Sequence, residues 1–315
     1  MWTSWVASAD LAGTSSSRTR YEARGATTPR VLSRLTKQLI DWLPALPLIV
    51  LALALLIVPT LMVIVQSLRD DSGAWTLGAW VDTLGRRGDQ RAIVTSLGLG
   101  VVCATVSILV GAPVAWFLAR ATTLARASWL SLLNVGANFS GIGLAFGFTA
   151  SLGTYGLVTL LLQGAGIAFI PPSPASFLGL AIGYVYSNVP LFVLLTLPAM
   201  GVVQGDSMEA AAVLGASRLE FWRFIGLPVL APFLAAGWLL IFTWSIGIYG
   251  LAYALAGNAA TSQLRLMTLQ IGVSLNSAAS SQERAAVMAT LLLLIATVSL
   301  VAYRLVVRKA VQWVD

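Results

Sequence analysis

The sequence predicts an all-α protein that crosses a membrane several times. Hydrophobic residues make up 58% of its 315 residues, charged residues make up only 10%, and the mean hydropathy is +0.86. Soluble domains carry a charge at roughly a quarter of their positions. A single soluble core cannot hide this many apolar residues, so most of them face lipid or one another inside a bilayer.

Stretches of about 20 residues without Asp, Glu, Lys or Arg predict six membrane-spanning helices. They lie at 43–66, 92–118, 129–152, 176–200, 229–256 and 285–303. The third stretch is the most polar, because it contains Asn134, Asn138 and Ser140. These residues suit a helix that faces the bundle or a pore. The segment 155–170 is apolar but short and precedes Pro171. We therefore expect it to form an external, partly embedded helix and not a seventh span.

The distribution of basic residues predicts the orientation. Residues 1–40 are rich in Ser, Thr and Arg and too polar to fold, which predicts a disordered tail. The first span and an external loop follow at 41–91, and 304–315 form a second tail. Lys and Arg are more than twice as frequent on the side of the two tails as on the other side. The positive-inside rule then places both termini and the 201–228 connection in the cytoplasm.

The composition excludes several classes of protein. The chain has no His and a single Cys, Cys103, so the sequence offers no zinc cluster, haem ligand set, disulfide framework or histidine-based triad. Its only lysines, Lys37 and Lys309, follow no glycine-rich phosphate loop, so the chain is not itself an ATPase. The net charge of +7 is explained by membrane topology and needs no nucleic-acid partner. No metal or cofactor is expected.

The cytoplasmic connection 205–228 predicts two short helices. Asp206 and Glu209 have capping-box spacing, so the first helix should begin there, and Gly215 can adopt the left-handed conformation that ends a helix.

Ser217 and Glu220 repeat the capping-box spacing and begin the second helix, which runs through 221–226 before Pro228 marks the entry to the next span. Helices this short need packing against something else to be stable. Their own bundle is one candidate, through the apolar side chains of Leu219, Trp222, Phe224 and Ile225.

The same loop resembles the signature of the permeases of binding-protein-dependent ABC importers of the type I fold. That signature is E-A-A, three residues, G, nine residues, I, one residue, L-P. Every position is matched here, by Glu209, Ala210, Ala211, Gly215, Ile225, Leu227 and Pro228. The likeness in topology covers 92–303, the permease core. A weaker likeness, carried by GYVYSNVPLFVLLTLPAM before the loop, is to the branch that transports polyamines, iron and thiamine.

This resemblance implies a function and a set of partners. In the family, the loop docks as a bent coupling helix in a groove of an ATPase subunit. The expected complex therefore holds two copies of an ABC ATPase, a second permease (identical or related) and an external solute-binding protein. The chain itself is expected to be a non-catalytic, multi-pass subunit of a bacterial or archaeal-type cytoplasmic membrane, importing a small polar solute, with a slight preference for the polyamine-like branch. Glu209 and Gly215 should shape the ATPase contact, Ala210 and Ala211 should allow close approach, and Arg218 and Arg223 are candidates to pair with acidic groups.

Polar residues at membrane depth are the candidates for the translocation pathway. They are Asn134, Asn138, Tyr184, Asn188, Thr243 and Ser245. Asn188 is preferred, because Pro190 frees a backbone carbonyl close to it. The alternative for each residue is a hydrogen bond between helices, which is ordinary packing in membranes.

Two other functions remain open from the residues alone. A secondary transporter driven by a proton gradient needs ionisable residues at membrane depth, and the six predicted spans contain none. A transporter driven by sodium stays open, because a sodium site made of carbonyls and hydroxyls needs no such residue. A membrane enzyme acting on lipid needs an acid–base pair near the interface. The only acidic clusters, Asp70–Asp71 and Asp82–Asp89, are expected to balance nearby arginines and solvate the external loop.

Overall fold

The computed structural model describes residues 46–70, 72–167, 171–203, 206–257, 264–276 and 280–311. The chain divides into two compact units, Met1–Val58 and Pro59–Asp315. The described part of the first unit is the beginning of helix α2 (Leu46–Ser67). The predicted tail at 1–40 lies outside the described residues.

Helices account for nearly all of the second unit, as the composition predicts. Their bounds are α3 Gly78–Gly85, α4 Arg87–Ala119, α5 Thr123–Asn138, α6 Gly141–Leu152, α7 Leu157–Gly164, α8 Phe177–Val202, α9 Asp206–Val213, α10 Arg218–Phe221, η1 Trp222–Gly226, α11 Leu227–Gly247, α12 Gly250–Ala252, η2 Tyr253–Gly257, α13 Met267–Leu275 and α14 Ser280–Val311. The segments η1 and η2 are single turns of π-helix. Among the described residues, six helical segments are long and apolar enough to span a membrane, which agrees with the number predicted.

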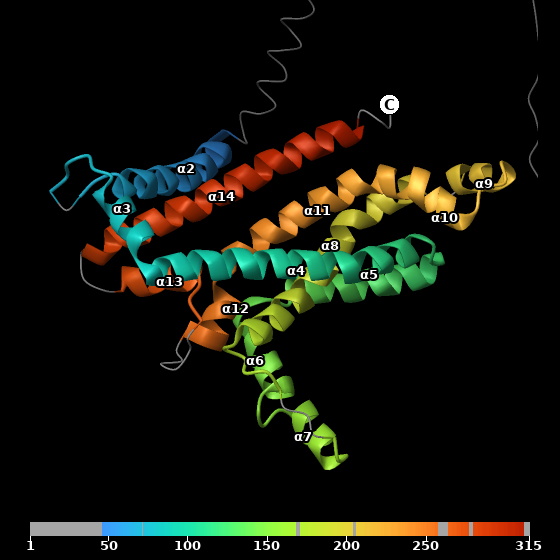
Figure 1. The fold of residues 1–315 in the computed structure, drawn as a ribbon, viewed down its shortest axis with the longest axis horizontal. Coiled ribbons are helices and arrows are strands. Elements are labelled where there is room, and N and C mark those ends of the chain that lie inside the picture. The colour runs from blue at the N-terminus through green and yellow to red at the C-terminus, as the bar shows by residue number, and fades with distance from the viewer. Residues whose placement is uncertain are drawn as a thin grey trace, which may run out of the picture. The chain divides into compact units, whose positions relative to one another are not determined.

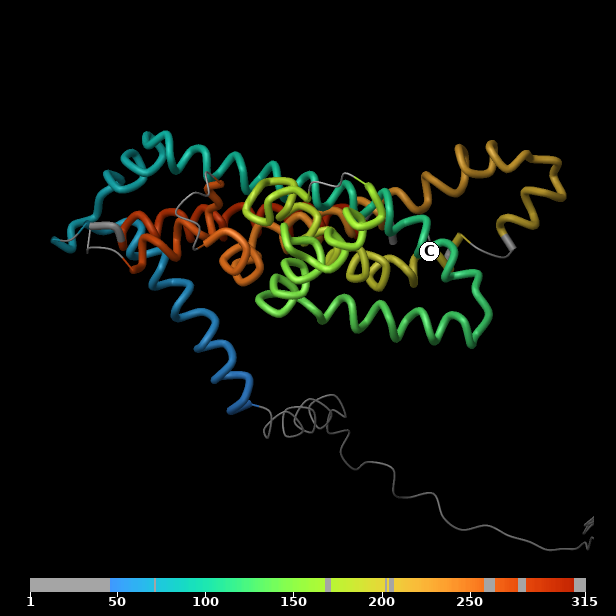
Figure 2. Tube along the Cα trace, turned by 90° about the horizontal axis from the view of Figure 1, so that it is seen from below, coloured from blue at the N-terminus to red at the C-terminus, as the bar shows by residue number. Residues whose placement is uncertain are grey.

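Helices α4, α8, α11 and α14 form the centre of the second unit (Figure 1). They approach closely where glycines of one helix face large side chains of another, as small residues allow in membrane proteins. Phe192 of α8 is fully buried between Gly111 of α4 and Gly237 of α11. The loop that holds α9 and α10 lies at one end of this group of helices, and α13 and the beginning of α14 lie towards the other (Figure 2).

The third predicted span is wrong as a single helix. Residues 129–152 are divided between α5 and α6, and the break falls at Phe139 and Ser140. The next residue, Gly141, has a φ of 68°, a conformation that ends a continuous helix. The third span-like segment is instead Gly141–Gly164, which combines α6 with α7, the short helix expected within 155–170.

Three further differences concern helix ends and loops. The fifth helix ends at Gly247, so residues up to 256 belong to the separate turns α12 and η2. The external loop 257–284 contains a helix of its own, α13, that the hydropathy pattern does not reveal. Helix α14 continues to Val311, so most of the tail predicted at 304–315 is helical.

Candidate coupling loop and translocation pathway

Helix α9 spans Asp206–Val213, and the chain turns after it at Gly215, as the sequence predicts. Gly215 has a φ of 79°, the left-handed conformation that glycine adopts without strain. The N–H of Ala216 donates to the carbonyl of Ala211 (3.0 Å), and the N–H of Gly215 donates to that of Ala212 (3.0 Å). This pair of bonds is the Schellman motif, which satisfies carbonyls that the end of a helix leaves open. The predicted cap by the Asp206 side chain lies outside the described side chains.

The second half of the loop begins with the predicted capping box. The backbone N–H of Ser217 donates to Glu220 Oε2 (2.8 Å), and the backbone N–H of Glu220 donates to Ser217 Oγ (3.3 Å). The predicted separate second helix is wrong, because α10 continues through the π-turn η1 directly into α11. Pro228 is the second residue of α11 and directly follows the π-turn η1. An unbroken helix therefore runs from the loop into a membrane span.

The inner side of the loop packs on the end of α4. Phe221 is 3% exposed and lies in one apolar cluster with Leu118 of α4. Arg120 lies over the ring of Trp116 at 4.2 Å from the ring centroid, and its Nη2 is 2.9 Å from the sulfur of Met208 in α9. This contact could not be predicted from the sequence, because it joins residues far apart in the chain and neither has a distinctive local pattern.

The outer side of the loop is exposed and largely apolar. Val213, Leu214 and Leu219 are 87%, 86% and 78% exposed. The signature residues lie on both the inner and the outer side of the loop. Ala211 is buried, whereas Glu209, Ala210 and Gly215 are exposed. Near the start of α11, the exposed residues are Arg218, Arg223, Ile225, Leu227 and Pro228. The loop thus offers a surface with carboxylate, guanidinium and apolar groups at one end of the second unit.

The pathway candidates separate into two groups. Tyr184, Asn188 and Ser245 are buried, and they hydrogen-bond between helices. Asn188 Nδ2 donates to Ser245 Oγ (2.8 Å), and the Tyr184 hydroxyl donates to the carbonyl of Ile248 (3.1 Å). Helix α8 is continuous through Pro190.

The other candidates are more accessible. Asn134 and Asn138 are exposed on α5, and Thr243 is half-buried on α11. Each donates to a carbonyl one turn earlier in its own helix, Leu130, Asn134 and Leu239 respectively, at 2.8 Å. Their role in the pathway stays a prediction.

Replacing Asn188 by alanine separates packing from a role in the pathway. The change removes a buried interhelical hydrogen bond, which contributes about 0.6 to 2 kcal/mol in membranes. We expect the unfolding temperature of the detergent-solubilised protein to fall by a few degrees, and Asn134→Ala, on the exposed face of α5, to leave it unchanged. An unchanged unfolding temperature for Asn188→Ala together with a raised KM for solute uptake would assign Asn188 to the pathway instead.

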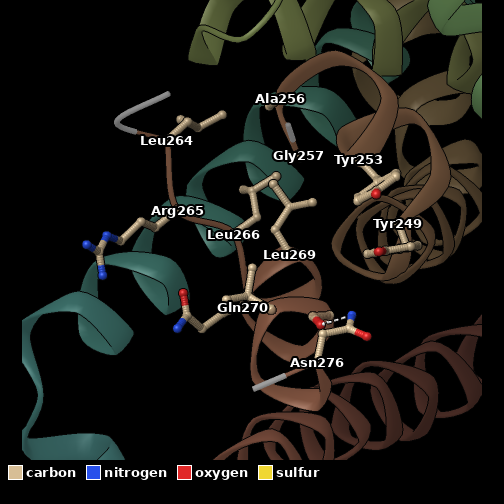
Figure 3. Close-up of a pocket in the computed structure, with 12 residues that line it drawn as sticks. Tyr249, Tyr253, Ala256, Gly257, Leu264, Arg265, Leu266, Leu269, Gln270 and Asn276 are labelled. Carbon is tan, nitrogen blue, oxygen red and sulfur yellow. Dashed lines mark hydrogen bonds between the residues drawn. The ribbon is translucent and has the colours of Figure 1, made fainter. Parts of the chain in front are cut away.

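A cavity of about 480 Å³ lies between the turns α12–η2 and helix α13 (Figure 3). Tyr249 and Tyr253 stack on one side, with ring centroids 5.3 Å apart and planes at 24°. Arg265 and Gln270 lie on the opposite side, towards α4. The cavity and the pairing of Tyr249 with Tyr253 could not be predicted from the sequence, because the lining residues come from segments that hydropathy assigns to a span and to a loop.

The acidic residues of the external loop have different environments. Asp70 is half-buried and accepts hydrogen bonds from the Ser72 hydroxyl and from the backbone N–H of Ala74. The hydrogen bond from the Ser72 hydroxyl is the main cause of the lowered pKa of Asp70. Asp89 is buried in the first turn of α4, so the expectation that it solvates the loop is wrong. Within the described ranges, no three His, Cys, Asp or Glu side chains are grouped to hold a metal ion.

Comparisons with known proteins identify similar sequences and a similar fold. No family model matches the chain. It is 38% identical to the sulfate transport system permease protein CysT of Salmonella typhimurium over 85 residues, which are 27% of this chain and 31% of CysT. It is 27% identical to the spermidine/putrescine transport system permease protein PotB of Escherichia coli over 208 residues, which are 63% of this chain and 74% of PotB.

The fold resembles a chain of the bacterial alginate ABC transporter, solved in complex with an alginate pentasaccharide-bound periplasmic protein. The TM-score is 0.62 at 18% identity, over 88% of this chain and 96% of the other. In sequence, the chain is therefore similar to permease proteins of sulfate and spermidine/putrescine transport systems, and in fold it is similar to a chain of a bacterial ABC transporter.

Proposed function

We propose that this permease forms half of the pathway by which a small polar solute enters the cell, and that the loop 206–228 couples it to a separate ATPase. The observation that carries the proposal is the loop itself. It matches the coupling signature of the family, turns at Gly215 after its first helix, and leaves Val213, Leu214 and Leu219 exposed. Exposed apolar surface marks a site of contact with another protein or with a membrane.

The connections of the loop supply a route for motion. The rigid continuation from α10 through η1 into α11 joins the loop to one span, and the contact of Arg120 with Met208 joins it to α4. When ATP draws two ATPase subunits together, a loop docked in each would therefore move α11 and α4 as a unit. Rigid-body motion of this kind switches a transporter between its inward-open and outward-open states.

The remaining partners and the orientation follow from the same proposal. The complex would contain a second permease, identical or related, and an external solute-binding protein. Both termini and the loop would lie in the cytoplasm, and α13 would lie on the external side. ATP hydrolysis is assigned to the partner, because the sequence contains no phosphate-binding loop.

Co-purification tests the proposal. The tagged protein, extracted in a mild detergent from its own membranes, should retain a subunit with a Walker A motif. Glu209→Lys reverses an exposed charge on α9, and we expect it to reduce the retained ATPase about tenfold or more, as loss of a charge-assisted contact does. Asp82→Lys makes the same change on the exposed surface of α3 and should have no effect.

A different outcome would favour the alternative, a gradient-driven carrier. If intact wild-type protein retains no ATPase, and if uptake into vesicles collapses with an ionophore but not on depletion of ATP, the coupling function is wrong.

A further inference from the structure

An open hollow of about 380 Å³ lies at the beginning of helix α4. The residues that line it all belong to this helix, and they are Arg87, Gln90, Arg91, Val94 and Thr95. Arg87 and Arg91 are exposed, and neither guanidinium forms an ion pair or a hydrogen bond with any residue that the structure describes. Like charges one turn apart destabilise a helix, so this pair of arginines favours a bound anion.

A third guanidinium adds positive charge beside the hollow. The side chain of Arg265 extends from the segment before α13 towards α4 (Figure 3), and its Nη1 lies so close to Gly88 that a Cβ there would collide with it. The carboxylate of Asp89 is buried and pairs with none of these arginines. Asp82 of α3 is exposed, and it too forms no ion pair within the described part of the chain. The exposed charge at this end of α4 is therefore positive.

After the two arginines, the same face of α4 continues as an apolar stripe. Its exposed side chains follow at helical spacing, and they are Val94, Val101, Val102 and Leu109. The opposite side of α4 packs on α8 and α11, and α4 runs along one margin of the second unit (Figure 2). From Val94 to Val102 the stripe extends about 12 Å along the helix, close to one leaflet of a hydrocarbon core about 30 Å thick.

We propose that this face of α4 binds an anionic phospholipid, with the phosphate at Arg87 and Arg91 and an acyl chain along Val94 and Val102. A phosphodiester accepts charge-assisted hydrogen bonds from guanidinium groups. Only an amphiphile covers both the basic hollow and the apolar stripe, because a soluble anion leaves the stripe bare. The choice of the outer leaflet rests on the orientation in the proposed function. Basic residues are scarce on that side of membrane proteins, so three unpaired arginines there need a local anion.

Titration of the purified protein, with the subunits it retains, with radiolabelled phosphatidylglycerol in phosphatidylcholine micelles tests the inference. We expect saturable binding that excess phosphatidylcholine does not displace. The double variant Arg87→Gln/Arg91→Gln should raise the mole fraction of phosphatidylglycerol at half-saturation about tenfold or more, because it removes the charges that attract the headgroup. Arg86→Gln makes the same kind of change at an exposed residue outside the hollow, and it should bind like the wild type.

Several results would overturn the inference. One is equal binding of phosphatidylglycerol by the wild type and the double variant, and another is displacement of the lipid by glycerol 3-phosphate at constant ionic strength, which would assign the hollow to a soluble anion. If the double variant keeps its lipid binding but loses association with a solute-binding protein, the arginines belong to that contact instead. The ATPase content of the same sample keeps the two proposals apart, because lipid binding without an ATPase would contradict only the coupling function.

Discussion

Replacing Gly215 by valine is expected to separate the permease from its ATPase while the membrane spans stay folded. Gly215 has a φ of 79°, and a Cβ there would meet no atom within 4 Å, so the cost is one of backbone conformation and not of collision. A β-branched residue in the left-handed region costs about 1 to 3 kcal/mol. The loop can avoid that cost by opening its Schellman turn, which changes the direction in which α9 presents Glu209 and Leu214.

The measurement is the amount of ATPase retained per permease after purification in detergent, together with the unfolding temperature. For Gly215→Val we expect about a tenfold or greater loss of retained ATPase, since 1.4 kcal/mol is a factor of ten. Asparagine tolerates the left-handed conformation, so Gly215→Asn should retain much more of it. Gly201→Val, at an exposed glycine near the end of α8 that has no positive φ, is the matched control and should resemble the wild type. Full retention by Gly215→Val would show that the turn does not shape the contact.

The features of the loop that could be predicted from the sequence are those set by a few neighbouring residues. The capping box of Ser217 and Glu220 and the left-handed Gly215 depend on spacings of at most four residues, and both are found as predicted. The number of spans was also predictable, because it depends on composition over about 20 residues.

Features that depend on contacts between distant segments could not be predicted in the same way. The break between α5 and α6 lies inside an apolar stretch, so hydropathy alone predicts one continuous helix through Phe139 and Gly141. Helix α13 is only nine residues long, too short for a span, and its beginning is fixed by Ser96 of another helix.

In the candidate site, too, local features could be predicted from the sequence and contacts between distant segments could not. The exposed signature residues were named from the sequence, but the contact between Arg120 and Met208 that holds α9 to α4 joins residues 88 positions apart. The polar residues predicted for the pathway were chosen for depth alone. Depth does not distinguish Asn188, which is fully buried, from Asn134, which is exposed.

The largest expected effect on folding comes from the space around Phe192. A Cβ added at Gly237 would lie 2.8 Å from Phe192 Cε2, and one added at Gly111 would lie 2.6 Å from Phe192 Cδ1. Real Cβ atoms do not come this close, so either helix must move away or the ring must leave its place. Overpacking of this kind costs about 1 to 3 kcal/mol for a small addition, and a leucine adds far more volume. We expect Gly237→Ala to lower the unfolding temperature by several degrees, and Gly237→Leu to prevent accumulation of folded protein in the membrane.

A double-mutant cycle with Phe192→Leu distinguishes this clash from a general effect of side chains on α11. Phe192→Leu alone should destabilise the protein, because it leaves unfilled space between α4, α8 and α11. If the clash is the cause, Gly237→Ala should cost less in the Phe192→Leu background than in the wild type, since residues in contact have coupled effects on stability. Gly98→Ala, at a position on α4 with no atom within 4 Å of the added Cβ, should be neutral or slightly stabilising. If the losses in the free energy of unfolding for Gly237→Ala and Phe192→Leu are strictly additive, the added Cβ does not clash with the Phe192 ring. The close approach of the helices at Phe192 would then not limit their packing.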